Sequence, residues 1–515
     1  MCGIAVAVGW DSASTAVRRL IAGMLHRGDI TDPLVALDER TAMCTRRLRI
    51  VAPEYGVQPQ ASFDDRFLVA FNGEIYNHGE LRRELESSGI HFRTECDTEV
   101  VANVVRLWGA NGLKRLEGMF AFVAIDALTG EFLAARDPFG VKPLYLVQTG
   151  DSFLFCSEIR PLLEATDEQD VLFLPPGHFL TRNFCGRYYK PSSESRSGEV
   201  SVEPIESLLE EAIRIRVPVD LPAALLFSGG IDSTLVAHYA RKFSPKMPGY
   251  IAVAPGAVDY EYAARYADAT GFDLQEVPIE IPSPNILSIL ETIVDVVETF
   301  EPAVIRPSLG TYLVSQRIHE DGFRVALCGE GADELFAGYE PLERAFGLGD
   351  SAGDYVKAQC LGMMHRANLQ RVDRCSMRFQ LEIREPFLDQ SIVAYSQRLG
   401  RESLFRNVGV STVGKAPLRA IYDHYPEKLP AFIRDRKKVL FHEGAGTDTV
   451  ASGWLDLFEG AISDTDFREG QRAFADFSVA TKEELFFLRA LSATIDLRRI
   501  PHLRSRLRLD VPLAA

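Results

Sequence analysis

The stretch Leu225-Leu226-Phe227-Ser228-Gly229-Gly230-Ile231-Asp232-Ser233 decides the fold of the larger part of this chain. An apolar run, residues 223–227, stops abruptly at Ser-Gly-Gly, and an amphipathic segment begins at Ser233 and Thr234. This pattern predicts a buried parallel strand, a tight glycine loop and the first turn of a helix.

The loop carries the chemistry of an anion site. Gly229 and Gly230 have no Cβ, so backbone N–H groups can approach an oxyanion closely, and the helix start adds partial positive charge. Ser228 and Ser233 add hydroxyl donors. Asp232 is a carboxylate in a phosphate loop and requires a cation beside it, for which Mg²⁺ is the candidate. The alternative interpretation is an ordinary glycine turn between a strand and a helix.

The pattern Ser-Gly-Gly-x-Asp-Ser, residues 228–233, resembles the pyrophosphate loop of the ATP pyrophosphatases. Those enzymes cut ATP between the α and β phosphates and make an acyl-adenylate. The resemblance implies an ATP site in the second half of the chain.

Composition narrows the class of protein. The 515 residues suffice for about two to four domains, and 46% hydrophobic with 25% charged residues is typical of a globular protein. A net charge of −16 argues against general nucleic-acid binding. There is no apolar run of about 18 residues, so no membrane span is expected. The eight cysteines form no CxxC pair, and with no secretory pattern this predicts a cytoplasmic location.

A β-branched strand begins at residue 2, directly after Met1. If Met1 is removed, Cys2 carries a thiol and its own α-amine, whose pKa near ~8 lets it accept the thiol proton. The alternative is a buried cysteine in a first strand. Residues 45–51 predict a short cationic strand. Residues 69–77 predict a strand that ends at Asn72-Gly73 before a helix through Leu85.

Two local features suggest roles for polar groups. The Asn72 side chain and the Gly73 backbone N–H can face one oxygen and form an oxyanion hole. Asp97 begins a helix that is predicted to end near Trp108, and helix capping is its alternative role.

Seven segments then resemble, in order, the class II glutamine amidotransferase domain: MCGI, RLRIV, FNGEIYNH, CDTEV, LEGMFAFVAID, RDPFGVKPLYL and FCSEI. The resemblance covers nearly all of residues 1–190 and implies an α+β, four-layer αββα sandwich of the N-terminal-nucleophile type. It implies Cys2 as the nucleophile that forms a γ-glutamyl thioester and releases ammonia, with Asn72 and Gly73 in the oxyanion hole. The implied glutamine-binding residues are Arg47, Leu48, Arg49, Ile50, Val51, Asn72, Gly73, Glu74 and Asp97.

One departure concerns the loop His26-Arg27-Gly28-Asp29, which lacks the proline that relatives have before the aspartate. The ordering of this loop is therefore left open, and His26 is interpreted as structural.

Residues 191–204 are interpreted as a linker, since residues 191–199 are polar without apolar periodicity. In residues 205–515 helical and strand patterns alternate. A helix is expected at 202–216, a strand at 250–253 and helices at 259–270 and 285–299. This alternation predicts an α/β doubly wound parallel sheet.

Two further stretches carry chemistry. A strand at 323–327 leads into an acidic glycine loop, where Asp333 could meet Asp232 across a shared Mg²⁺ and Glu330 is a candidate base. The alternative is that these carboxylates cap a helix, an interpretation adopted for Glu334. Four cations at 434–438 are followed by apolar residues and glycines, so they either form a solvated face or close over phosphates.

The second half resembles the glutamine-hydrolysing asparagine synthetase family through VETFEPAVIRPS, LCGEGADELFAGY, RANLQRVDRCSM and LEIREPFLD, as far as about residue 445. The resemblance implies Mg²⁺ at Asp232 and Asp333, a lysine for pyrophosphate at Lys438 and a glutamate for the acyl-adenylate steps at Glu330. The implied ATP-binding residues are Phe227, Ser228, Gly229, Gly230, Asp232, Ser233, Val253, Cys328 and Gly329.

Other departures bear on the acceptor. Cys328 stands where relatives usually have Ser, and the segment from Lys438 is more similar to the β-lactam synthetase branch. That branch tends to lose the nucleophilic cysteine and the loop glutamate, whereas this chain keeps Cys2 and Glu330. Arg306 could pair with an acceptor carboxylate or form a structural ion pair.

The sequence therefore predicts a ligase that uses glutamine, ATP and Mg²⁺ to convert an acceptor carboxylate, with aspartate first, into an amide through an acyl-adenylate. The open alternatives are a specialised carboxylate (a sugar uronate, a peptide or a natural-product intermediate), intramolecular ring closure and a non-catalytic binding protein. Small molecules are the expected partners, without nucleic acid or membrane, and a homodimer is left open.

Overall fold

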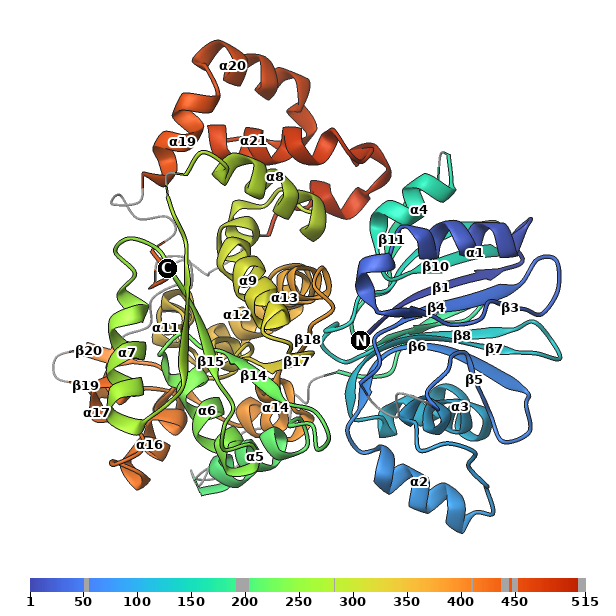
Figure 1. Cartoon of the computed structure of the whole chain (residues 1–515), viewed down its shortest axis with the longest axis horizontal. Helices are drawn as coiled ribbons and strands as arrows, with labels where there is room; N and C mark the ends of the chain where they lie inside the picture. Colours follow the sequence, from blue (N-terminus) through green and yellow to red (C-terminus); the bar gives the residue numbers. More distant parts are fainter. Residues whose placement is uncertain are drawn as a thin grey trace. The chain divides into compact units, whose positions relative to one another are not determined.

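The computed structural model describes residues 1–50, 55–167, 169–190, 203–281, 283–408, 411–436, 444–446 and 453–507. The chain forms two compact units (Figure 1). The first unit contains Met1–Lys190, Met377–Gln380 and Leu491–Ser505, and the second contains Pro191–Ser376, Leu381–Ala490 and Arg506–Ala515. Most of the predicted linker, residues 191–202, lies outside the described residues, and the predicted division into domains stays a prediction.

In the first unit two antiparallel sheets pack face to face, and helices cover both outer faces (Figure 1). The first sheet has the spatial order β11 (Leu172–Phe173), β9 (Tyr145–Thr149), β10 (Ser152–Cys156), β1 (Cys2–Val8), β4 (Ala42–Arg47) and β2 (Ile30–Thr31), with β3 (Val35–Ala36) also paired to β4. The second sheet has the order β13 (Cys185–Arg187), β12 (His178–Leu180), β8 (Phe132–Arg136), β7 (Gly118–Asp126), β6 (Phe67–Ile75) and β5 (Gln60–Ala61). Helices α1 (Ala13–Ala22) and α4 (Ile159–Ala165) lie on the first sheet, and α2 (His78–Ser87) and α3 (Asp97–Trp108) on the second. The predicted αββα sandwich is confirmed.

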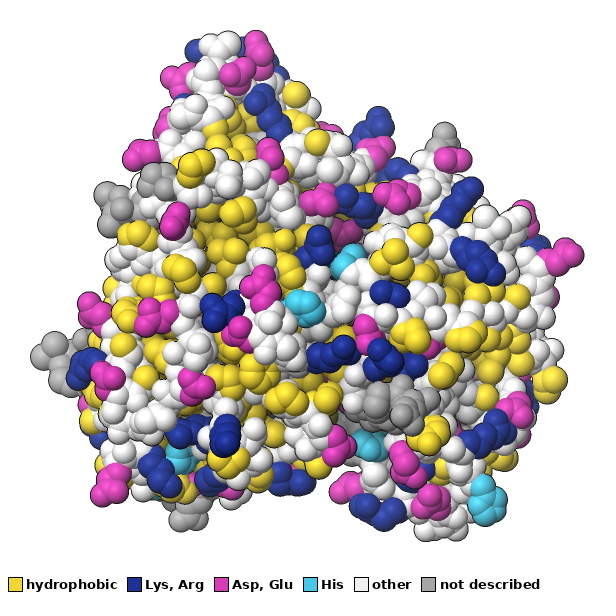
Figure 2. Space-filling view, viewed as in Figure 1, with side chains coloured by type: hydrophobic (Ala, Val, Ile, Leu, Met, Phe, Trp, Pro, Cys, Tyr) yellow, Lys and Arg dark blue, Asp and Glu magenta, His cyan; other side chains and the backbone are white. Residues whose placement is uncertain are grey.

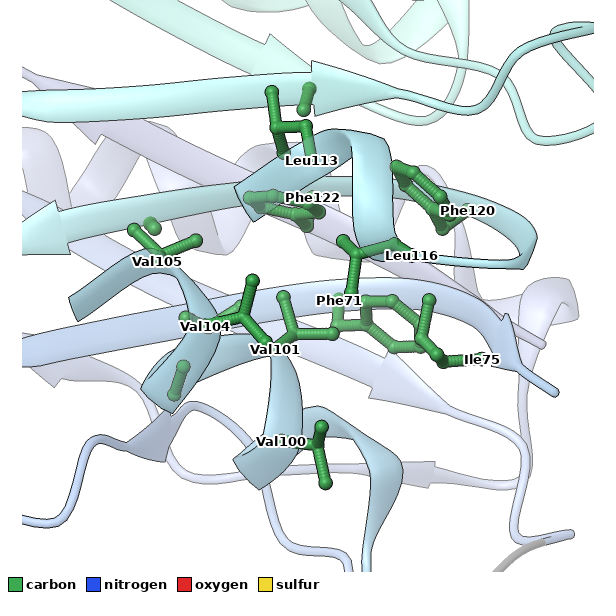
Figure 3. Close-up of a cluster of buried hydrophobic side chains, with 14 of the residues drawn as sticks. Phe71, Ile75, Val100, Val101, Val104, Val105, Leu113, Leu116, Phe120 and Phe122 are labelled. Carbon is green, nitrogen blue, oxygen red and sulfur yellow. The ribbon is translucent and has the colours of Figure 1, made fainter. Parts of the chain in front are cut away.

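Strand β7 shows why this sequence builds two layers. Its side chains alternate between faces, as in any strand. Ala121, Val123 and Ile125 lie in the core between the sheets. Phe120 and Phe122 face the other way, into a cluster with apolar residues of α3 such as Val101 and Val104 (Figure 3). Because both faces are apolar, the strand is buried on both sides and holds the sandwich together.

Two predicted strands have different ends in the structure. The strand predicted at 45–51 is β4, which ends at Arg47 because its partner β1 begins at Cys2, the residue paired with Arg47. The strand predicted to end at Asn72-Gly73 is β6, which continues to Ile75 because β7 pairs with it over its whole length. Asn72 and Gly73 therefore lie within a strand.

The second unit is built on a parallel sheet whose order in the described residues is β16 (Leu274–Pro278), β15 (Gly249–Val253), β14 (Ala223–Leu226), β17 (Val325–Leu327) and β18 (Glu382–Arg384). The chain moves outward from β14 through β15 to β16, then returns to the other side of β14 as β17. The loops that follow β14 and β17 consequently meet at the point where the strand order reverses, the usual ligand site of such sheets. This is the predicted doubly wound α/β architecture.

Helices accompany these strands (Figure 1). Before β18 they are α5 (Glu203–Arg214), α6 (Ile231–Phe243), α7 (Val258–Thr270), α8 (Ile286–Val297), α9 (Pro302–Glu320), α10 (Ala332–Leu335), α11 (Glu340–Gly347), α12 (Asp350–Met363) and α13 (Asn368–Met377). After β18 they are α14 (Gln390–Gln397), α15 (Arg401–Leu404), α16 (Ala416–His424), α17 (Ala431–Arg434), α19 (Trp454–Ala461), α20 (Asp464–Ala473) and α21 (Lys482–Ser492), and β19 (Arg406–Val408) pairs with β20 (Ser411–Val413).

The segment Leu491–Ser505 belongs to the first unit although it is distant in sequence. The Arg499 guanidinium donates to the backbone carbonyls of Leu163, Thr166 and Gln169, and the Arg499 carbonyl accepts from Val171 N–H. The His502 ring stacks on Tyr145 with centroids 6.3 Å apart. This docking has no counterpart in the sequence analysis, because the tail carried no recognisable motif.

On the face shown in Figure 2, side chains of both signs are interspersed over each unit. In the part of the chain that the structure describes, every helix is too short or too polar to cross a membrane.

Candidate active sites

The first site is built around Cys2 at the start of β1. Cys2 lies opposite Arg47 in the β1–β4 pairing, and its backbone N–H donates to Asn72 Oδ1 at 2.7 Å. The sandwich thus brings together three residues that are distant in sequence. Cys2 is 6% exposed, and burial raises the pKa of its thiol to about 11 even though the terminal amine lowers it.

Asn72 and Gly73 have the local structure expected of oxyanion donors. Asn72 is fully buried, and among the described residues its Nδ2 has no hydrogen-bond partner. A buried donor without a partner is unfavourable, and an oxygen atom of a bound substrate would satisfy it. Gly73 has φ +153°, and a Cβ there would lie 2.0 Å from the Met119 carbonyl oxygen. Only glycine fits at this position.

Arg27 contacts Cys2, a contact that the sequence did not indicate. Its side chain is completely buried, Nε donates to the Cys2 carbonyl at 3.1 Å, and Nη1 donates to Glu158 Oε1 at 3.1 Å. His26 Nε2 lies 2.9 Å from the same oxygen, which agrees with a structural role. Asp29 N–H bonds to the Arg47 carbonyl, so this loop is held in place without the proline.

The predicted glutamine-binding residues from Arg47 to Ile50 differ in their partners and in how close to the surface they lie. Arg47 Nε donates to both carboxylate oxygens of Asp32, at 3.1 and 2.9 Å, whereas Arg49 pairs with Asp29 nearer the surface. Leu48 N–H bonds to the Met1 carbonyl, and Ile50 packs beside Met1 and Leu48. Val51 lies outside the described residues.

Two acidic residues complete the predicted glutamine site. Glu74 follows Gly73 in β6 and is half-buried. Asp97 is the first residue of α3, one position after its N-cap Cys96, and it accepts the Ile75 N–H at 3.0 Å. Burial raises the pKa of the Asp97 carboxyl. Asp97 therefore ties α3 to the strand that carries Asn72 and Gly73.

The raised thiol pKa leads to a prediction about Met1. While Met1 is present, the backbone nitrogen of Cys2 is part of a peptide bond and cannot act as a base. A thiol with a pKa of about 11 is protonated at pH 8. Glutaminase activity should therefore be proportional to the fraction of chains that lack Met1. Preparations with different fractions, determined by intact mass, would test this, and equal activity in a preparation that fully retains Met1 would contradict it.

The second site is a cavity of about 710 Å³ within the second unit. Most of the predicted ATP-site residues line it: Phe227, Ser228, Asp232, Ser233, Cys328 and Gly329, together with Glu330 and Asp333. Gly230 lines an adjoining cavity of about 230 Å³. Val253 ends β15 but does not line either of these cavities, and its neighbour Ala252 lines the larger one.

Glycines allow the loops after β14 and β17 to approach each other, and allow the first of them to approach α7. Gly229 has φ +64°, and a Cβ there would lie 2.6 Å from Ala263 N. A Cβ on Gly329 would lie 2.9 Å from the Asp232 Cβ. The chain between β14 and α6 can therefore turn tightly and present the helix start to the cavity, as predicted for a phosphate loop.

Asp232 and Asp333 are brought together around one cation. Lys415 Nζ lies 2.5 Å from Asp232 Oδ2 and 2.7 Å from Asp333 Oδ1, and the three side chains are almost fully buried. Two carboxylates that share an ammonium ion can also share a divalent cation, and Mg²⁺ commonly takes one or two carboxylates together with substrate phosphates. The residues therefore fit Mg²⁺. Lys415 was not singled out from the sequence.

Glu330 is held by two neighbours. Arg371 Nη2 bonds to Glu330 Oε1, and Asn368 Nδ2 donates to Glu330 Oε2 at 2.8 Å. Glu334, interpreted from sequence as a capping residue, lines the same cavity and accepts from the Tyr339 hydroxyl at 2.9 Å. Burial raises the pKa of the Glu334 carboxyl to about 7, with help from the nearby carboxylates.

Two other predicted residues, Lys438 and Arg306, are not found in the lining of these cavities. Lys438 lies outside the described residues. Upstream of it, Arg436 forms an ion pair with Asp259, and both line the smaller cavity. Arg306 does not line either of the two cavities described above, and its guanidinium binds Glu483 with N–O distances of 2.9 and 2.6 Å.

Comparison with known proteins agrees with both halves of this description. The model of the glutamine amidotransferase domain family matches residues 1–174, and the asparagine synthase family model matches residues 204–359 and 349–499. The chain is 30% identical to a glutamine-hydrolysing asparagine synthetase 2 of Oryza sativa over 95% of its length and 84% of the relative's. It is 30% identical to a probable asparagine synthetase of Schizosaccharomyces pombe, covering 95% and 93%. It is 29% identical to asparagine synthetase 3 of Arabidopsis thaliana, covering 95% and 86%. With these matches and this pair of sites, the chain belongs to the asparagine synthase family of glutamine-hydrolysing, C–N bond-forming ligases.

Proposed function

We propose that this ligase transfers ammonia from glutamine to an acceptor carboxylate that ATP has activated as an acyl-adenylate. Glutamine-dependent, ATP-driven amidation follows from the family. The observation that carries the finer proposal is the pair Asp232 and Asp333 around one cation beside the glycine loop. That arrangement suits a cation bound to the phosphates of ATP.

At the first site Cys2 attacks the glutamine side-chain carbonyl, and its proton passes to its own α-amine after Met1 has been removed. Asn72 Nδ2 and the Gly73 N–H stabilise the developing oxyanion. Arg47 and the backbone of residues 48–51 hold the glutamine α-carboxylate, while Glu74 and Asp97 take its α-ammonium. The intermediate then collapses to the thioester and its C–N bond breaks, so that the nitrogen takes the proton from the α-amine and leaves as ammonia for the second site. Water hydrolyses the thioester, which releases glutamate and restores the Cys2 thiol.

At the second site residues 228–233 bind the phosphates of ATP, and Phe227, Cys328 and Gly329, which line the larger cavity, surround the nucleoside. Asp232 and Asp333 would hold Mg²⁺, which neutralises phosphate charge when bound. Lys438 stabilises the leaving pyrophosphate. Glu330, held by Arg371 and Asn368, accepts the proton that ammonia loses as the amide forms.

Aspartate is the acceptor that the sequence predicts, and relatives named asparagine synthetase support it. A second candidate is a carboxylate with a different body, favoured by the ion pair that ties Arg306 to Glu483. Intramolecular ring closure needs no ammonia, and the complete set around Cys2 argues against it.

The test is the fate of ATP. The full chain is incubated with Mg-ATP, ammonium chloride and a panel of carboxylates that includes aspartate, and the phosphorus products are identified by NMR. The proposal predicts AMP and pyrophosphate in equal amounts, dependent on an acceptor. ADP with inorganic phosphate would indicate an acyl phosphate and would refute the acyl-adenylate.

A further inference from the structure

The ammonium group of Lys415 lies between the two carboxylates that are predicted to hold a metal ion. Its Nζ is 2.5 Å from Asp232 Oδ2 and 2.7 Å from Asp333 Oδ1. Lys415 is 3% exposed, and the two aspartates are 8% and 7% exposed. Because little water screens a buried ion pair, its attraction is stronger than that of a surface pair. A metal ion that binds these carboxylates therefore competes with a cation that belongs to the chain itself.

The backbone of Lys415 is held in the position that this contact requires. Lys415 is the N-cap of α16 and has φ +62°, in the left-handed region that is unfavourable for a residue with a side chain. Its N–H donates to the Phe336 carbonyl at 2.8 Å, and its carbonyl accepts the Arg419 N–H at 2.9 Å. Such a conformation persists only where the surrounding structure imposes it, and it is frequent at functional sites. Movement of the ammonium group must then come from rotation of the side chain.

The loop after α10 is shaped to receive this side chain. A Cβ on Gly338 would lie 1.8 Å from Asp333 Oδ1 and 2.5 Å from Lys415 Cε. The Gly338 N–H donates to the Asp333 carbonyl at 2.9 Å. Glycine thus lets the backbone pass directly beside both partners of the ion pair, where any other residue would displace one of them.

The ammonium group would have a second partner close by if it left the carboxylates. Lys415 lines the smaller cavity, which Ser228 and Gly230 of the phosphate loop line as well. Lysine carries its charge on a flexible four-carbon stem, so Nζ can turn toward this cavity while the backbone stays fixed. Phosphate oxygens bound at the loop would then replace the carboxylates as its partners.

We propose that Lys415 holds the metal site when no nucleotide is bound, and that a divalent cation enters only as the ammonium group leaves. A metal ion and an ammonium group cannot both fill the space between the same two oxygens. An ion bound to the other carboxylate oxygens would still lie close to Nζ, and like charges repel strongly where water is excluded. Free metal should therefore bind weakly. Nucleotide phosphates should favour the exchange, because they supply ligands to the ion and a partner to Lys415. The inference rests on the proposed magnesium assignment and adds the order of events at that site.

Binding of Mn²⁺ to the full chain without nucleotide tests the inference, with free Mn²⁺ measured by electron paramagnetic resonance. Lys415→Met keeps a side chain of similar length and removes its charge. Its dissociation constant for Mn²⁺ should be at least ~10-fold lower than that of the wild type, since a like charge is no longer present beside the ion. Lys415→Gln should show the same gain and serves if the first variant does not fold, because its amide can still donate to a carboxylate. Equal or weaker Mn²⁺ binding in the folded variant would overturn the inference.

Lys242→Met is the matched control. Lys242 lies on α6, the helix that carries Asp232, but it is exposed and pairs with Glu210, so its loss should change the Mn²⁺ affinity by less than about 2-fold. Adding Asp232→Asn to Lys415→Met should remove the gain. A gain that survives this second substitution would place the new metal site elsewhere and would overturn the inference. If neither the wild type nor the Lys415 variants bind Mn²⁺, the magnesium assignment itself is refuted, and the inference with it.

Discussion

Replacing Cys2 by Ala should abolish glutamine-dependent amide formation and leave ammonia-dependent amide formation within about 2-fold of the wild type. The substitution removes the nucleophile that forms the thioester, and losses of at least ~10³-fold are usual when a nucleophile is removed. The backbone N–H of residue 2 still reaches Asn72 Oδ1, so the fold of the first unit should be kept. The second site lies in the other unit and contains none of these atoms.

Cys44 provides the matched control for this variant. It is a buried cysteine on β4, the neighbouring strand of the same sheet, and its thiol pKa is also raised by burial. Cys44→Ala should retain glutamine-dependent activity. If Cys2→Ala loses the ammonia-dependent reaction as well, the two units do not divide the work as proposed.

Replacing Asp232 by Asn should reduce acceptor-dependent pyrophosphate release by at least ~10²-fold, since removing one group that stabilises a charged transition state usually has an effect of this size. Asn keeps the volume of Asp232 but removes one of the two negative charges around Lys415 Nζ. Mg²⁺ would then have Asp333 as its remaining carboxylate from this pair. Glutaminase activity at Cys2 should be unaffected.

Asp268→Asn is the control, because Asp268 is exposed on α7 of the same unit and surface substitutions usually have small effects. Pyrophosphate release is measured at saturating ATP and over a range of Mg²⁺ concentrations. If Asp232→Asn releases pyrophosphate at the wild-type rate at every Mg²⁺ concentration, Asp232 does not hold the metal ion. The predicted role of the glycine loop would then be contradicted as well.

The parts of this molecule that follow from local pattern could be predicted from sequence. The apolar run before Ser228 and the amphipathic segment after it specify β14 and α6. The loops after β14 and β17 then meet because a parallel sheet places its strand ends at one edge, which is why Asp232 and Asp333 could be paired in advance. The end of β4 could not be predicted from the sequence, because Arg47 is the last strand residue only through its pairing with Cys2.

What the sequence did not predict depends on contacts between residues far apart in the chain. Lys415 reaches Asp232 across 183 positions, and Arg27 reaches Glu158 across 131. A single basic residue in a helix or turn carries no local sign of such a partner. Arg306 shows the same limit, because its partner Glu483 is 177 positions away and meets it only through the packing of α9 and α21.

The most direct test of the central claim follows the nitrogen and the nucleotide in one reaction. The full chain, with Met1 removed, is given glutamine labelled with ¹⁵N in its side-chain amide, Mg-ATP and a panel of aspartate and apolar monocarboxylates. Mass spectrometry then quantifies every product. The account predicts glutamate, AMP, pyrophosphate and one ¹⁵N-labelled amide in equal amounts. Glutamate formed without acceptor-dependent AMP, or an unlabelled amide, would contradict it.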